Sequence, residues 1–311
     1  MSCRLAVILV AILWHAATGA GAEHRSAETR IEMRRVNLHP DDAVILYVNH
    51  LSGKLAPTQR GTIPVFDDKN SFAITIDSAE ITISSAALTS MLNLYVFADP
   101  KSPIRNVKIS IDGRQLKQTG TLHKGVDLPF EMEGTIATTD DGNIRIHPKK
   151  LKVAHLPVKG LLDLFGVETD DLVSGKHVRA MRVEHEDLIL DPEALIPAPK
   201  IQGRLRGVRL IKDALVETYG DGSNPRGPGN RNYIAYRGGT IRFGKLTMTD
   251  ADLKLIDANA HDPFDFSVDH YKDQLVAGYS KTTPASGLEV FMPDYYKVRK
   301  AAGAKTPQLS K

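Results

Sequence analysis

The sequence predicts an α+β fold in which a long, curved antiparallel β-sheet wraps around amphipathic helices. Three observations support this fold class. Many short segments alternate apolar and polar residues, as strands with one buried face do. Asp-Gly pairs at 112–113 and 141–142 separate such segments and predict hairpin turns. An almost uncharged segment, residues 86–97, has the spacing of a helix that is largely surrounded by other elements.

The chain begins with an expected secretory signal peptide, residues 1–22. Its uncharged run, 5–14, follows Arg4, and small residues precede a cleavage site near Ala22. The run is too short for a membrane anchor, because crossing a bilayer takes roughly 18 to 20 apolar residues. We therefore expect a periplasmic or secreted protein.

Composition narrows the classes of function. The 311 residues carry 40 Lys and Arg against 37 Asp and Glu, and the two signs alternate along the chain. This balance predicts no nucleic-acid partner. The single cysteine, Cys3, leaves with the signal peptide, so we expect neither a disulfide nor a thiol nucleophile in the mature chain.

The organisation along the chain follows from pattern and composition. The residues after the signal peptide are charged and lack an apolar period, and the last residues are small and polar. The expected segments are the signal peptide 1–22, a flexible leader 23–42, a sheet-and-helix module 43–175, a second β-rich module 176–298 packing on the first, and a disordered tail 299–311.

The first module is expected to open with strands. Segment 43–51 is short, β-branched and aromatic, which is typical of either a buried strand or a short helix. Segment 72–77 alternates apolar and polar residues and predicts a half-buried strand. Ile81 and Ile83 fall on the opposite parity, so a turn or bulge is expected near 78–80 if all these residues face one core.

The helix expected at 86–97 begins after a serine cap, either Ser84 or Ser85. Its apolar residues follow the i, i+3, i+4, i+7 spacing, and Leu94 widens the apolar stripe. Pro100 prevents the helix from continuing.

An antiparallel meander is expected after this helix. Segments 107–111 and 116–122 form a hairpin, and 130–138 and 144–147 add two more strands. One face of the meander is apolar and must be buried. A second amphipathic helix is expected at 158–167.

The C-terminal half is also expected to be β-rich. Residues 220–232 are rich in Gly, Pro and Asn and predict a surface loop. Gly238-Gly239 is expected to form a hairpin turn. The strand-like pieces are 177–184, 200–211, 232–248 and 251–257.

No motif predicts a catalytic site, a metal site or a cofactor. His185 stands among acidic residues in VEHED, a composition more typical of a solvated turn than of a metal site. Asp250, Asp252 and Asp257 lack the Gly and Glu of a calcium loop. The sequence contains neither a phosphate-binding glycine motif nor a nucleophile elbow. We therefore assign no catalytic residues, no metal ligands and no cofactor.

Residues 74–172 resemble LmeA-like bacterial envelope proteins, which are similar in plan to the tubular lipid-binding (TULIP) superfamily. The resemblance lies in the helix at LTSMLN, the hairpin ending in QTGTL, the LPFEMEGT strand and the later LPVKGLLDLFG. It implies a TULIP-like curved sheet around a helix, with an apolar groove for acyl chains. It covers about a third of the chain, and the C-terminal half has no counterpart in it.

Together, the export signal, the amphipathic pattern and the resemblance predict a non-enzymatic lipid-binding protein. It would hold or ferry phospholipid or a related amphiphile for envelope maintenance, with transient contact to a membrane surface. This hypothesis requires an apolar wall that its own side chains do not fill. Two alternatives stay open: a structural or assembly module that binds another envelope protein, and a hydrolase whose site is assembled in space. The predicted groove residues are Met91, Tyr95, Phe97, Ile109, Ile111, Phe130, Met132, Leu162 and Phe165.

Overall fold

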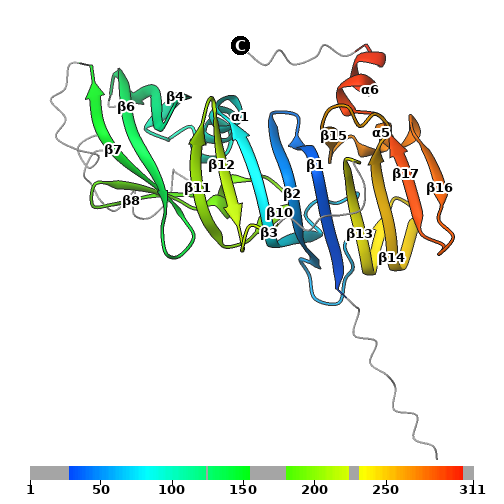
Figure 1. The fold of residues 1–311 in the computed structure, drawn as a ribbon. Coiled ribbons are helices and arrows are strands. Elements are labelled where there is room, and N and C mark those ends of the chain that lie inside the picture. The colour runs from blue at the N-terminus through cyan, green and yellow to red at the C-terminus, as the bar shows by residue number, and fades with distance from the viewer. Residues whose placement is uncertain (1–27, 124, 155–179, 224–230, 304–311) are drawn as a thin grey trace, which may run out of the picture.

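The computed structural model describes residues 28–123, 125–154, 180–223 and 231–303, which form two β-sheets and a few short helices (Figure 1). Sheet A has eleven strands and sheet B has six. One hydrophobic core runs through both sheets. The β-dominated part of the expected fold class is confirmed. Among the described residues, no helix has the length and apolar character needed to span a bilayer.

The middle of sheet A is an antiparallel meander of three long N-terminal strands. They are β1 (Thr29–Asp41), β2 (Val44–Pro57) and β3 (Phe72–Ser84). The flexible leader expected at 23–42 is therefore wrong over its described part. β1 buries Ile31 and Met33, and then Val36 and Leu38, so its apolar alternation changes parity midway. Because of that change, β1 as a whole does not show one constant period-2 pattern of apolar residues, which is the pattern that predicts a strand.

A band of irregular residues crosses these three strands. The register between β2 and β3 shifts at Asn49 and again at Asp77, so the bulge predicted near 78–80 is confirmed close to that position. In β1, Arg35 adopts a left-handed φ of 48°, at the point where the neighbour of β1 changes from β13 (Tyr233–Phe243) to β15 (Phe264–Ser267). Apolar side chains on both sides of this band join the same core.

C-terminal strands flank the meander on both sides. On the β3 side lie β12 (Ala214–Tyr219) and β11 (Leu205–Ile211), and β10 (Lys200–Gln202) pairs in parallel with β3. On the β1 side, β13 is followed by β14 (Leu246–Asp257), β17 (Leu288–Met292) and β16 (Tyr279–Thr282). Sheet A is therefore mixed, and the module boundary expected at 175/176 is wrong, because strands from both sides of it share one sheet.

Two local expectations in the C-terminal half are also wrong. Gly238 and Gly239 lie inside β13, and the hairpin turn falls instead at Gly244 and Lys245, between β13 and β14. The single strand expected over 200–211 is divided into β10 and β11.

Sheet B is an antiparallel arrangement in the order β4, β5, β6, β7, β9, β8. The predicted hairpin and the two strands after it are confirmed, although β7 runs further than expected. The helix expected at 158–167 lies outside the described residues. The strands are β4 (Ile104–Asp112), β5 (Gln115–His123), β6 (Asp127–Thr138), β7 (Ile144–Val153), β8 (Met181–Glu184) and β9 (Asp187–Leu190).

The helices lie at the junction of the sheets and at the C-terminal end (Figure 1). The helix predicted at 86–97 is present as α1 (Ser85–Met91) followed by the π-helical turn η1 (Leu92–Val96). Leu94 is 48% exposed, so it does not extend the buried stripe as expected. The other helices are α4 (Pro192–Leu195), α5 (Tyr271–Val276) and α6 (Tyr295–Ala301). α6 reaches Ala301, so the disorder expected from 299 is wrong for residues 299–301, and residues 304–311 lie outside the described ranges.

Candidate ligand pocket

An apolar pocket lies where sheet B meets α1, η1 and the β3–β12 side of sheet A. Apart from Gln118 and Glu217, the described residues around it are all apolar. They are Ile83, Leu88, Met91, Leu92, Phe97, Ile109, Leu116, Ile136, Ile144, Ile146, Met181, Leu188, Leu190, Pro192, Leu195, Ile196 and Leu215.

Polar side chains fix the helix that forms one wall of this pocket. Ser84, the predicted cap, accepts a hydrogen bond from the Ala87 amide through its hydroxyl oxygen, at 3.1 Å. Asn93 donates to the Val107 carbonyl at 2.7 Å and accepts from the Val107 amide at 2.9 Å. Thr89 accepts from the Ile109 amide at 2.9 Å. The polar side chains of the helix therefore form hydrogen bonds with backbone groups at the outer edge of β4. Its apolar side chains face the pocket.

The enclosed space of this pocket is small. Its volume is about 40 Å³, whereas one water molecule takes up about 30 Å³ in the liquid. The elongated hollow that the lipid hypothesis requires is therefore not present at this position. The side chains of the pocket fill most of it themselves.

A larger groove opens on the same sheet, with a volume of about 860 Å³. Its walls include Phe130, Leu151 and Val153, with Glu131 and Lys152 beside them. Small-molecule sites commonly measure 300–1,000 Å³, so the groove has room for a ligand. Gly120 contributes to this shape, because a Cβ atom there would lie 2.7 Å from the Phe130 ring.

Met132 pairs with one residue of the pocket wall and with one residue of the groove wall. Its cross-strand partners are Gln118, which lines the pocket, and Leu151, which lines the groove. Directly opposite residues project from the same face of a sheet. Met132 therefore shares its face with Gln118 of the pocket and Leu151 of the groove, whereas Glu131 and Lys152 of the groove wall belong to the opposite face.

The structure brings together only some of the predicted groove residues. Tyr95 lines neither space, and its hydroxyl donates a hydrogen bond to Asp41. Ile111 and Met132 are packed in the core without lining either space. Leu162 and Phe165 lie outside the described residues. Met91, Phe97 and Ile109 line the pocket, and Phe130 lines the groove.

Glu217 is a pocket residue that the sequence analysis missed. It lies on β12, is 2% exposed and accepts a hydrogen bond from the Tyr219 hydroxyl at 2.9 Å. Burial raises the pKa of the Glu217 carboxyl to about 7, and the hydrogen bond from Tyr219 only partly opposes this shift. Segment 214–219 was not among the predicted strands. The β-branched and aromatic residues Val216, Thr218 and Tyr219 were a signal that could have found it.

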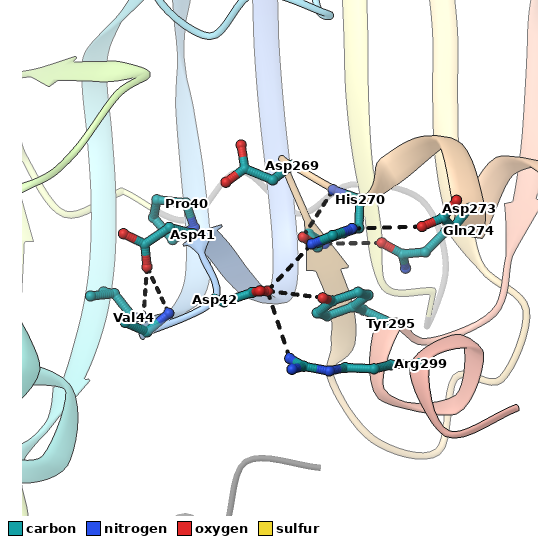
Figure 2. Close-up of polar contacts among 12 residues, drawn as sticks. Pro40, Asp41, Asp42, Val44, Asp269, His270, Asp273, Gln274, Tyr295 and Arg299 are labelled. Atoms are coloured by element: carbon teal, nitrogen blue, oxygen red, sulfur yellow. Dashed lines mark hydrogen bonds and ion pairs between the residues drawn. The ribbon is translucent and has the colours of Figure 1, made fainter. Parts of the chain in front are cut away.

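A second polar cluster joins the β1–β2 turn to the C-terminal helices (Figure 2). The Asp42 carboxylate accepts a hydrogen bond from the Tyr295 hydroxyl at 2.9 Å. The same oxygen lies 3.6 Å from His270 Nε2 and 3.7 Å from a terminal guanidinium nitrogen of Arg299. The His270 ring also stacks on Tyr295. These contacts connect segments more than 200 residues apart in the sequence.

Beneath this surface, Asp265 is held by several partners. Its carboxylate lies 2.5 Å from His39 Nε2 and accepts from the Tyr296 amide at 3.0 Å. The Asp265 amide donates to Asp294 at 3.1 Å, and Asp294 in turn binds Lys297 at 2.6 Å. No Ser, Thr or Cys side chain takes part in these contacts among the described residues. The arrangement ties β15 and α6 to β1.

The acidic segments considered from the sequence are spread out. His185 lies in the exposed turn between β8 and β9, and Asp250, Asp252 and Asp257 lie along β14. Within the described ranges, no group of three or more His, Cys, Asp or Glu side chains is placed to hold a metal ion.

Comparison of the chain with protein-family models, with curated proteins and with solved structures finds no match.

Proposed function

We propose that the protein is a non-enzymatic lipid-binding protein that holds one amphiphile along the apolar face of sheet B. The supporting observation is that Met132 pairs across the strands both with Gln118 of the pocket wall and with Leu151 of the wall of the 860 Å³ groove. The apolar chain would start in the groove and extend toward the pocket. The amphiphile would be a phospholipid or a related molecule, carried in the periplasm or outside the cell after signal-peptide cleavage.

Chain burial supplies enough free energy for this role without catalytic groups. Each buried methylene contributes about 0.8 kcal/mol, so a chain of about ten carbons gains roughly 8 kcal/mol. The pocket of 40 Å³ holds no such chain in its present form. Binding beyond the groove therefore requires the Met132 side chain to move, which suits an unbranched and flexible residue.

Charges at the groove fit an amphiphile with an anionic head. Lys152 lines the groove, and the neighbouring Lys150 is already paired with Glu133 at 2.8 Å. A phosphate at the mouth would find Lys152 as its nearest described cation in the groove wall. The proposal includes transient contact with a membrane surface, where the amphiphile is collected or released. An LmeA-like, TULIP-like origin of the sheet-and-helix plan is part of the same proposal.

The test places a bulky side chain in the groove. Leu151→Trp should lower the uptake of a fluorescent phospholipid by at least tenfold, because the indole would occupy the space of the chain. Leu246→Trp, at an exposed position of β14 remote from the groove, is the matched control and should bind as the unmodified protein does. Uptake is measured by fluorescence titration of the mature chain.

Native mass spectrometry of the purified protein provides the second measurement. A mass increase that disappears on solvent extraction, together with lipid in the extract, is the expected result. A ligand-free protein that also takes up no fluorescent lipid would contradict the proposal and favour the assembly module.

A further inference from the structure

Glu217 is a carboxyl group placed against an apolar pocket. Its neighbours across the sheet are Ile81 on β3 and Val208 on β11, and both are apolar. Leu215, two residues earlier on β12, lines the same pocket. A buried polar group without a full set of hydrogen bonds costs roughly 1 to 3 kcal/mol. Packing alone therefore gives no reason for a carboxyl group at this position.

The hydrogen bonds of Glu217 are incomplete within the described residues. Oε2 accepts from the Tyr219 hydroxyl at 2.9 Å, and Oε1 accepts from no described group. No described cation lies close enough to stabilise the Glu217 carboxylate. Burial raises the pKa of the carboxyl to about 7, so the neutral form is well populated near neutral pH.

The size of the pocket matches a small polar group. The enclosed volume of about 40 Å³ is slightly more than the roughly 30 Å³ that one water molecule occupies. A hydroxyl group fits this space and would supply a hydrogen-bond partner for Oε1. A phosphate or an ionised carboxylate would instead place a second negative charge in a pocket whose described wall contains no cation.

We propose that Glu217 recognises a hydroxyl group at the inner end of the bound chain, so that the preferred ligand is a long-chain alcohol or a similarly hydroxylated chain. This inference rests on the proposed function and narrows its ligand class. The hydroxyl lies against Glu217, the chain passes Met132, and the rest of the molecule occupies the groove. Any charged head stays at the groove mouth, beside Lys152.

The experiment uses the mature chain loaded with a fluorescent apolar probe and three competitors of equal chain length. Dodecan-1-ol carries a hydroxyl, 1-methoxydodecane has no O–H group, and dodecanoate is ionised. The alcohol should displace the probe about tenfold more tightly than the ether, which is the effect of about one hydrogen bond. The alcohol should also displace the probe more tightly than dodecanoate does at pH 8.

Two variants assign the preference to Glu217. Glu217→Gln keeps the size and hydrogen-bonding ability and should retain the preference for the alcohol. Glu217→Leu should abolish it, so that alcohol and ether displace the probe equally. If the leucine variant does not fold, the competitor series in the unmodified protein and in Glu217→Gln still tests whether the alcohol is preferred.

The outcomes separate this inference from the function on which it rests. Probe binding without a preference for the alcohol would overturn the role of Glu217, since an ordered water then explains the space, and the lipid-binding function would stand. Tighter binding of dodecanoate would overturn the role as well. If neither the probe nor any competitor binds, the lipid-binding function itself fails.

Discussion

Asp265 and Glu217 are two buried carboxyl groups in contrasting surroundings. They are 6% and 2% exposed, yet among the described residues Asp265 has His39 and the Tyr296 amide as partners, while Glu217 has only Tyr219. The first lies among polar groups that join distant segments, and the second faces an apolar pocket. Two carboxyl groups that are similarly buried therefore differ in their hydrogen bonding, and this difference indicates different roles. A saturated buried group holds elements together, whereas an unsaturated one beside a space is a candidate for ligand recognition.

The largest loss of stability should come from removing the Asp265 carboxylate, which has several hydrogen-bond partners. Asp265→Ala leaves His39 buried without its carboxylate and frees the amide at the start of α6. We expect the free energy of unfolding to fall by about 3 to 5 kcal/mol, measured by urea denaturation. Asp269→Ala, which removes only the more exposed pair with Lys69, should cost less than about 1 kcal/mol. Equal losses of stability in the two variants would mean that Asp265 holds these elements together no more strongly than an exposed ion pair does.

A pH series should separate Glu217 from ordinary surface carboxyls. Its pKa rises from 4.5 to about 7 on folding, so between these values the folded state binds more protons than the unfolded state. Stability therefore falls as pH rises through this window, by about 3 kcal/mol in total, and is not regained above it.

Glu217→Gln removes this contribution. Relative to the unmodified protein, the variant should be more stable at pH 8 than at pH 5 by about 3 kcal/mol, as measured by denaturation at both values. Parallel pH profiles would mean that the carboxyl is better solvated than its position indicates.

The smallest expected effect concerns the wall of the pocket. Ser84→Ala removes the cap of α1 and should lower the free energy of unfolding by about 1 kcal/mol. Ser90→Ala, within the same helix, should be neutral or slightly stabilising, because alanine favours a helix interior. Thermal denaturation of both variants measures the difference. A loss as large as that of Asp265→Ala would show that the pocket wall is as critical to the fold as the polar cluster.

Local sequence signals predicted the parts of the fold that depend on neighbours in the chain. The Asp112-Gly113 turn gave the β4–β5 hairpin, and Ser84 gave the start of α1. Apolar spacing predicted buried faces that include Met91 and Ile109, and both residues line the pocket. In each case a few adjacent residues determine the geometry, through a turn, a cap or a period.

Features that depend on distant partners were not predictable in this way. The pairing of β1 with β13 and of β3 with β12 joins segments more than 100 residues apart. Arg35 interrupts the alternation of β1, and so this strand was expected to be a flexible leader. Tyr95 carried the right residue type for the groove, but a partner at Asp41 turns it away. Glu217 acquires its chemistry only through burial by other elements.

The irregular band at Arg35, Asn49 and Asp77 constrains how this protein can change. In each strand the buried apolar residues change there between odd and even positions, so that the apolar face stays directed toward the core. Losing a single residue from one strand would turn half of that strand outward unless its neighbours lost theirs as well. We therefore expect insertions and deletions to be tolerated in the connecting loops, and to be rejected across the centre of sheet A.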